Sequence, residues 1–283
     1  MRYSLVCAAL YARGPAVVTA FALPLAVVSA GLIAPRSARA ADRVTDRAVD
    51  LVQRVHDQAT QDEETASMAM RLIDAEGKVR ARKASYAQRR TEPGAATSAR
   101  LIRFSAPPEM DGSGILTIER NGPADDQWLY LPAYHSSRKI PSSNRTDRYM
   151  GTDFSYEDVS ADRIAAYRYV FAASVVIDGR RYSQVEQTPI AEQPAAGYGR
   201  KVLFIDPERL LVRKVDLYGR TGLLIKRLEG SDPARFGAVW RWARMTMTDF
   251  RIEHSTVIDY TDRHIGSGAA ASLFTVRNLE RGR

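Results

Sequence analysis

The chain has 283 residues, of which 45% are hydrophobic, and it carries a formal net charge of +8 with a single cysteine. This length suits one large domain. The basic residues are spread along the chain rather than gathered with base-stacking aromatics, which argues against a nucleic-acid-binding protein. Beyond Cys7 the chain has no cysteine, which excludes disulfides and thiol chemistry there.

Residues 1–40 are predicted to be a cleavable signal peptide. They combine a basic start, an apolar run from Ala16 to Ala34, and small residues at Ala38 and Ala40, so cleavage is expected before Ala41. The alternative is an uncleaved membrane anchor, since the run is roughly long enough to cross a bilayer. A proline within the run weakens that alternative. Cleavage would leave residues 41–283 as a single exported domain with a net charge of about +4.

After the signal peptide, one helix and then many short strands are predicted. Val44, Leu51 and Val55 recur at helical spacing and indicate a helix over 44–57. Alternating apolar residues separated by turn signals then predict strands. These strands are expected at 68–73, 79–86, 101–104, 115–119, 128–131, 167–177, 182–188, 201–205, 211–217, 223–228, 239–250 and 256–260. These twelve ranges, taken as about ten or eleven short strands, indicate a mainly β fold with an antiparallel sheet or barrel. A further helix is predicted at Ser155, where Asp158 completes a capping pair.

Motifs for catalysis and for cofactor binding are missing from the sequence. It has no His-Glu-x-x-His, no Gly-x-Ser-x-Gly and no glycine-rich phosphate or dinucleotide loop. The histidines do not share a metal-ligand spacing; they are His56, His135, His254 and His264. The acidic residues Asp153, Glu157, Asp158 and Asp162 lack the alternate spacing of a calcium loop, which favours carboxylates at a helix start. We therefore predict no catalytic residue, no metal and no cofactor.

Two groups of side chains are candidates for binding. Met68, Met70 and Leu72 form an apolar stripe, and methionine suits surfaces that accept varied apolar partners. Trp128 and Tyr130 share one face of a strand whose other face is also apolar. Ordinary core packing explains each of these residues as well as a ligand cavity does. The basic residues Arg138, Lys139, Arg145 and Arg148 fit either a solvated loop or contacts to an anionic headgroup or an acidic partner.

Several segments, in the same order, resemble one protein family. The longest is residues 127–158, which begin Gln-Trp-Leu-Tyr-Leu-Pro and end Phe-Ser-Tyr-Glu-Asp. Before it come the amphipathic segment near Asp50, the methionine-rich strand from Met68 to Ile73, and the loop from Ser105 to Leu116, which has an extra alanine before its two prolines. The ending from Leu273 to Arg281 is the last. The chain is similar to the outer-membrane lipoprotein-sorting proteins, whose fold is related to that of the periplasmic lipoprotein carriers.

The resemblance implies a curved antiparallel sheet that forms a half-open β-barrel, covered by a few helices. It also implies an apolar cavity under that sheet, and possible work beside an inner-membrane export pump. The residues expected to line the cavity are Met68, Met70, Leu72, Leu116, Trp128, Tyr130, Phe154 and Tyr156. On this view Trp128→Glu should abolish cargo binding and leave the fold intact.

The resulting hypothesis is a monomeric periplasmic carrier that holds acyl chains of a lipid or lipoprotein. One alternative is a periplasmic sensor or scaffold that binds a protein partner with the same fold, as in a related family of stress regulators. Another is a lipid hydrolase, which would need a serine, a histidine and an acid converging in the cavity.

Overall fold

The protein is represented by a computed structural model that describes residues 36–60, 63–92, 95, 97–120, 125–160, 163–190 and 197–281. The expected signal peptide, apart from its last five residues, lies outside the described residues. Asp162 of the acidic cluster also lies outside them.

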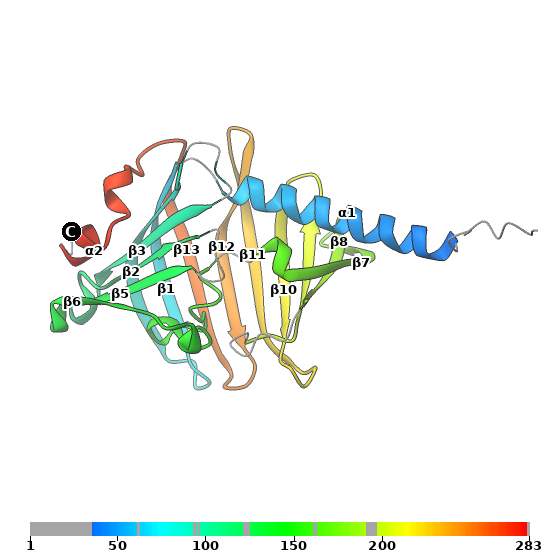
Figure 1. Ribbon diagram of the computed structural model, residues 1–283. Helices are drawn as coiled ribbons and strands as arrows, with labels where there is room; N and C mark the ends of the chain where they lie inside the picture. Colours follow the sequence, from blue (N-terminus) through cyan, green and yellow to red (C-terminus); the bar gives the residue numbers. More distant parts are fainter. Residues whose placement is uncertain are drawn as a thin grey trace, which may run out of the picture.

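One antiparallel sheet of 13 strands makes up most of the described chain (Figure 1). The strands are β1 (Glu63–Ile73), β2 (Val79–Arg90), β3 (Ser98–Ala106), β4 (Gly114–Ile118), β5 (Asp126–Leu131), β6 (Ser136–Lys139), β7 (Tyr167–Ile177), β8 (Arg180–Pro189), β9 (Arg200–Asp206), β10 (Leu211–Tyr218), β11 (Leu224–Phe236), β12 (Val239–Asp249) and β13 (His254–Ile265). Their spatial order is β6-β5-β4-β3-β2-β1-β13-β12-β11-β10-β9-β8-β7. Since β6 and β7 end this order without pairing to each other, the sheet is open, as the resemblance implied.

Among the described residues, two α-helices and six short 3-10 helices accompany the sheet. They are α1 (Arg36–Ala59), α2 (Val276–Glu280), η1 (Pro108–Met110), η2 (Pro132–Tyr134), η3 (Ser142–Asn144), η4 (Tyr149–Gly151), η5 (Ile164–Ala166) and η6 (Ala271–Leu273). None of the helices in the described part of the chain has both the length and the apolar composition that a membrane span requires.

Helix α1 lies across the β7–β10 end of the sheet (Figure 1). Its apolar residues Ala48, Leu51 and Val52 are buried against Tyr169 of β7 and Val185 of β8. Burial of each larger apolar side chain stabilises this contact by about 1.5–3 kcal/mol. The helical spacing that predicted residues 44–57 therefore marks the face that docks on the sheet.

The C-terminal segment covers the outer face of the other half of the sheet. Leu279 of α2, Phe274 and Ala269 are buried against Leu101 of β3 and Leu116 of β4. This contact covers one face of strands β3–β5. Side chains on that face therefore cannot reach the space on the opposite, inner face of the sheet.

Two local predictions were wrong. Arg138 and Lys139, expected in a basic turn or loop, lie on the edge strand β6 (Ser136–Lys139), which accounts for one of the strands beyond the expected number. Residues 156–159 form turns rather than the predicted helix. The capping pair is nevertheless present, because Ser155 donates from its backbone nitrogen and its hydroxyl to Asp158 Oδ2 at 2.8 Å. A capping motif closes a single turn as readily as it starts a helix.

Candidate functional site

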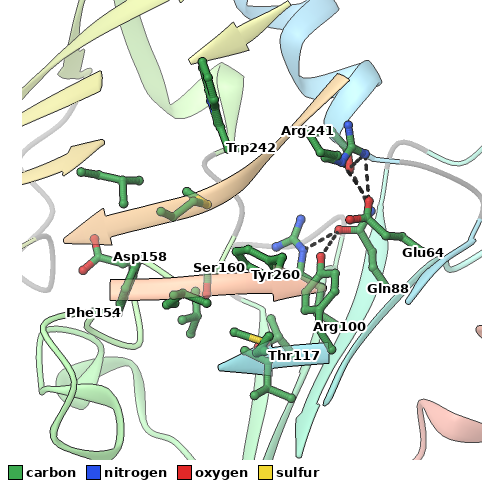
Figure 2. Close-up of a pocket in the computed structure, with 18 of the residues that line it drawn as sticks. Glu64, Gln88, Arg100, Thr117, Phe154, Asp158, Ser160, Arg241, Trp242 and Tyr260 are labelled. Atoms are coloured by element: carbon green, nitrogen blue, oxygen red, sulfur yellow. Dashed lines mark hydrogen bonds and ion pairs between the residues drawn. The ribbon is translucent and has the colours of Figure 1, made fainter. Parts of the chain in front are cut away.

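A cavity of about 470 Å³ lies between the inner face of the sheet, the end of α1 and the segment from Tyr149 to Ser160 (Figure 2). Its wall is mainly apolar and comes from many strands. Apolar wall residues include Met68, Met70, Ile102, Ile115, Leu211, Leu228, Met245 and Ile258. Polar side chains gather at one end of it.

Strand alternation turns these residues inward. In β1 the buried positions are Glu64, Ala66, Met68, Met70 and Leu72, and the residues between the last three are exposed. Successive side chains of a strand point to opposite faces of its sheet. The methionine stripe therefore faces the interior of the half-barrel, as its spacing indicated.

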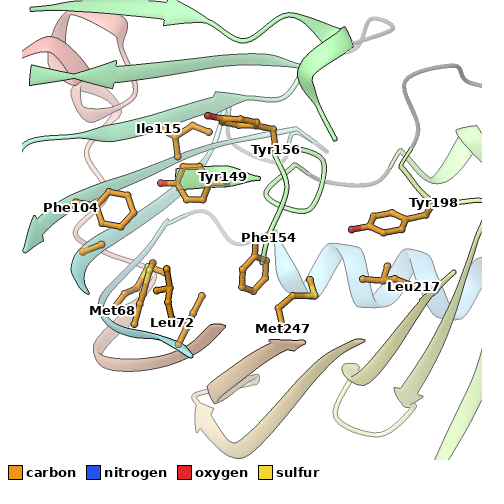
Figure 3. Packing of buried hydrophobic residues seen from close by; sticks show 13 residues of the cluster. Met68, Leu72, Phe104, Ile115, Tyr149, Phe154, Tyr156, Tyr198, Leu217 and Met247 are labelled. Atoms are coloured by element: carbon orange, nitrogen blue, oxygen red, sulfur yellow. The ribbon is translucent and has the colours of Figure 1, made fainter. Parts of the chain in front are cut away.

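The segment from Arg148 to Ser160, here called the inner loop, packs aromatic side chains against the inner face (Figure 3). The ring centroid of Tyr149 lies 6.1 Å from that of Phe104 and 5.8 Å from that of Tyr156. Phe154 is also buried and contributes to the cavity wall. Where the resemblance implied helices over the mouth, the structure places the end of α1 together with this loop, whose one helical piece is the short 3-10 helix η4.

A buried carboxylate anchors the inner loop to β13. Asp153, which has no exposed surface, accepts hydrogen bonds from Arg148 Nη2 and Thr256 Oγ1, both at 2.7 Å. His254 Nδ1 lies 2.7 Å from the same carboxylate. Its other ring nitrogen is buried without a hydrogen-bond partner among the described residues. The loop is thus held by three side chains around one acid.

The other acidic residues of the inner loop also accept hydrogen bonds from other parts of the protein. Glu157 accepts from the backbone nitrogen of Gly197 at 2.7 Å, and Asp158 accepts from the hydroxyl of Tyr198 at 3.0 Å. Lys226 lies 3.5 Å from Asp158. Burial, followed by the Asp158 charge, raises the pKa of Tyr198 well above its usual value. The prediction of helix-start carboxylates was wrong, because these acids tie the loop to distant segments.

The polar end of the cavity is a network of buried charges, here called the charged end. Glu64 lies 2.9 Å from Arg241 Nη2 and 3.3 Å from Arg263 Nε. Arg100 pairs with Glu119 at 2.8 Å and donates to Gln88 at 3.1 Å. Figure 2 shows Glu64, Gln88, Arg100 and Arg241 clustered on one side of the cavity, with Asp158 on the other.

The charged end also terminates α1. Arg241 donates from Nη2 to the carbonyl of Gln58 at 3.0 Å, and Gln88 donates to the carbonyl of Ala59 at 3.0 Å. The last carbonyls of a helix lack partners within it and carry partial negative charge, so cationic and amide donors stabilise them. The network therefore fixes the end of α1 at the cavity.

Burial changes the protonation equilibria at this end. It lowers the pKa of the Arg263 guanidinium, because a charged group loses hydration there. It raises the pKa of Tyr260 to about 12, so this cavity tyrosine stays neutral at physiological pH. The cavity thus presents fixed cations and neutral hydroxyls.

The predicted cavity residues fall into three groups. Met68, Met70 and Phe154 lie on the cavity wall. Leu72 and Tyr156 are buried in the core beside it and do not line it.

The expectation that Leu116, Trp128 and Tyr130 line the cavity is corrected. Leu116 pairs with Trp128, and both share a cluster with Tyr130 beneath the C-terminal segment. Ile115, the neighbour of Leu116, faces the cavity instead. Both faces of this strand pair are apolar because one faces the cavity and the other is covered by residues 269–279.

Trp128→Glu is now expected to leave cavity binding within about twofold of the wild type. The substitution places its charge on the outer face, where Lys139 already lies over the indole ring. Titration of both proteins with an apolar fluorescent probe checks this. Loss of binding in a variant with an unchanged circular dichroism spectrum would show that Trp128 does reach the ligand.

The four basic residues predicted to contact a headgroup or partner do not gather at the cavity. Arg138 and Lys139 lie on the edge strand β6, where Arg138 stacks over Tyr134 and Lys139 pairs with Asp126. Arg148 instead holds Asp153 of the inner loop. None of the four is among the cavity-lining residues, which include Arg100, Arg241 and Arg263.

Sequence reasoning missed the charged end, although a signal was present. Glu64 continues the alternation of Met68 and Met70, so its side chain had to face the same interior. Arg241 lies between two tryptophans. A charged residue at an inward strand position is unusual and marks a buried ion pair or a ligand site.

The histidines do not form a catalytic or metal-binding group among the described residues. His135 is exposed on a turn, while His254 is buried behind the inner loop. Within the described ranges, no group of three or more histidine, cysteine or acidic side chains is arranged to hold a metal ion.

Comparisons with known proteins identify close structural relatives. A family model described as that of an uncharacterized protein matches residues 96–281. An outer membrane lipoprotein-sorting protein domain from Vibrio parahaemolyticus, so described, is 27% identical with a TM-score of 0.77, over 84% of this chain and 100% of that one. A DUF1329 family protein from Desulfovibrio piger is 25% identical with a TM-score of 0.78, over 83% and 99%.

A LolA superfamily protein from Nitrosomonas europaea shares the fold, with a TM-score of 0.60 and 18% identity over 83% of this chain and 97% of that one. No curated protein matches the chain by sequence. The resemblance to lipoprotein-sorting proteins and the half-open barrel fold are confirmed.

Proposed function

We propose that the protein carries an acylated molecule through the periplasm. The chain belongs to the family whose model matches residues 96–281. It is similar to an outer membrane lipoprotein-sorting protein domain and shares the fold of a LolA superfamily protein, and these similarities support the proposal. The acyl chain would occupy the cavity under the half-barrel. The observation that supports this proposal is the cavity itself, about 470 Å³ in volume and walled by apolar side chains from strands β1–β4 and β10–β13.

The physical task of a carrier fits this wall. Exposing an acyl chain to water costs about 0.8 kcal/mol for each methylene, or on the order of 10 kcal/mol for a long chain. Met68, Met70 and Met245 can adjust their side chains to different chain shapes. Shielding by such residues offsets the cost without any bond being made or broken.

Location and partners follow from the same proposal. Export would use residues 1–40 as a signal peptide cleaved before Ala41, within the first turns of α1, which starts at Arg36. The mass of the protein purified from its own cells tests this cleavage. An inner-membrane export pump as the donor of cargo stays a prediction from the resemblance.

Saturable binding of an apolar probe tests the carrier proposal. We expect N-phenylnaphthylamine to gain fluorescence on titration into the delipidated protein, with one site per chain, and to be displaced by long-chain amphiphiles. Weak, unsaturable binding that amphiphiles do not reverse would contradict the proposal and would favour a scaffold that binds a protein partner.

A further inference from the structure

We propose that the charged end of the cavity is a binding site for the anionic headgroup of a single-chain amphiphile. This inference rests on the proposed carrier function and specifies its cargo. It assigns the headgroup to Arg263 and Arg100 and the acyl chain to the apolar wall.

The first argument is a charge imbalance inside the protein. Three guanidinium groups, those of Arg100, Arg241 and Arg263, line this end of the cavity, and they meet two carboxylates, Glu64 and Glu119. One of the three guanidinium groups is therefore left without a carboxylate, although the carbonyl end of α1 offsets part of the charge of Arg241. Buried charges are costly unless they are paired, and one negative charge on a ligand would complete the set.

The second argument is that Arg263 has unused hydrogen-bonding capacity. Its side chain is only 7% exposed, and its Nε lies 3.3 Å from Glu64 without the alignment of a hydrogen bond. Nη1 donates to the carbonyl of Trp242 at 3.0 Å. Thr60, also on the cavity wall, has a buried hydroxyl with no hydrogen-bond partner among the described residues. Buried polar atoms in proteins are normally satisfied. Both atoms belong to cavity-lining residues but have almost no accessible surface of their own, so a polar group in the cavity reaches them after a small shift of these side chains.

Arg241 has a different role. Its Nε donates to Glu64, Nη1 donates to the carbonyl of Trp240, and Nη2 donates to the end of α1. Glu64 competes with any anion for these cations, because it contacts both Arg241 and Arg263. This competition lowers the affinity of the site for an anion, so a bound ligand can also be released.

The cavity volume limits the number of chains. About 470 Å³ lies in the lower half of the range of roughly 300–1,000 Å³ for pockets that enclose one small ligand. This favours a fatty acid or a lysophospholipid-like molecule over a cargo with several acyl chains. A carboxylate and a phosphate share the chemistry that an arginine pair recognises.

Displacement of N-phenylnaphthylamine from the delipidated protein by dodecanoate, dodecyl phosphate, dodecanol and dodecylamine tests the inference. We expect the two anions to bind at least about 10-fold more tightly than dodecanol, as a hydrogen bond to a charged group implies, and dodecylamine to bind most weakly. The stronger of the two anions then distinguishes a carboxylate from a phosphate headgroup.

Two variants act in opposite directions. Arg263→Gln should weaken dodecanoate binding by about 10-fold and leave dodecanol unchanged. Glu64→Gln, which removes the competing carboxylate, should strengthen dodecanoate binding, an effect that loss of folding does not imitate. Arg244→Gln is the matched control, because Arg244 is an exposed arginine on the neighbouring strand β12 and pairs with Asp259 of β13.

Equal affinity for dodecanoate and dodecanol would overturn the headgroup site and leave the carrier proposal standing. Failure of all four amphiphiles to displace the probe would overturn the carrier proposal itself. Unchanged dodecanoate binding in both cavity variants would show that the anion binds elsewhere.

Discussion

A Met245→Glu variant is expected to bind the apolar probe at least about 100-fold more weakly than the wild type, a loss of about 2.8 kcal/mol. Met245 is half-buried on β12 and faces the cavity. A carboxylate there stays hydrated in the empty cavity and loses its water when an acyl chain enters. The penalty therefore falls on binding rather than on folding, and probe titration with a thermal unfolding curve separates the two.

Ser67→Glu is the matched control for this experiment. Ser67 is exposed between the buried residues Ala66 and Met68 of β1, so the same charge is added on the opposite face of the sheet. We expect wild-type affinity for this variant. If Met245→Glu binds the probe as well as Ser67→Glu does, the cavity is not the binding site.

Replacement of Asp153 by leucine is expected to cost about 3 kcal/mol of unfolding free energy. Asp153 is completely buried, and its removal leaves Arg148, His254 and Thr256 without their common acceptor. Urea unfolding measures the loss, and hydrogen exchange should show faster exchange across residues 148–160, since the inner loop loses its anchor to β13.

Asp147→Asn provides the comparison for this effect. Asp147 precedes the same loop but is exposed, and its carboxylate accepts from Asn144 at the surface. We expect a change within about 0.5 kcal/mol. A similarly small change for Asp153→Leu, with unaltered exchange in residues 148–160, would mean that aromatic packing alone holds the loop.

The sheet was largely predictable from the sequence because alternation is a local property. Met68, Met70 and Leu72 alternate with exposed residues, and turns such as Asp178-Gly179 mark where strands end. The edge strand β6 was missed, since its four residues are polar and carry no alternation.

Which face of a strand meets the cavity was not predictable for β4 and β5. Leu116 and Trp128 are apolar in the same way as Ile115, and only the position of the C-terminal segment about 150 residues later shows that they lie outside the cavity. The inner loop poses the same difficulty. Asp153 and Asp158 have a helix-start spacing, but their partners His254 and Lys226 are far away in sequence.

The charged end illustrates a signal that local reasoning can use. Glu64 occupies an inward position of β1, and Arg263 occupies one near the end of β13. Glu64 is a charge where the alternation calls for an apolar residue. Arg263 is out of phase with Ile258 and Tyr260, and the register shift between Thr261 and His264 accounts for its place at the cavity. Their pairing requires the register of the folded sheet, which places β13 beside β1.

Native mass spectrometry of the protein purified from its own cells, with lipid extraction of the same sample, tests the central claim most directly. The carrier proposal predicts a bound acylated species at one copy per chain, and the headgroup site predicts that it is a single-chain anion. A protein that retains only its own mass under gentle conditions, and yields no lipid on extraction, would contradict the proposal that the cavity carries an acyl chain.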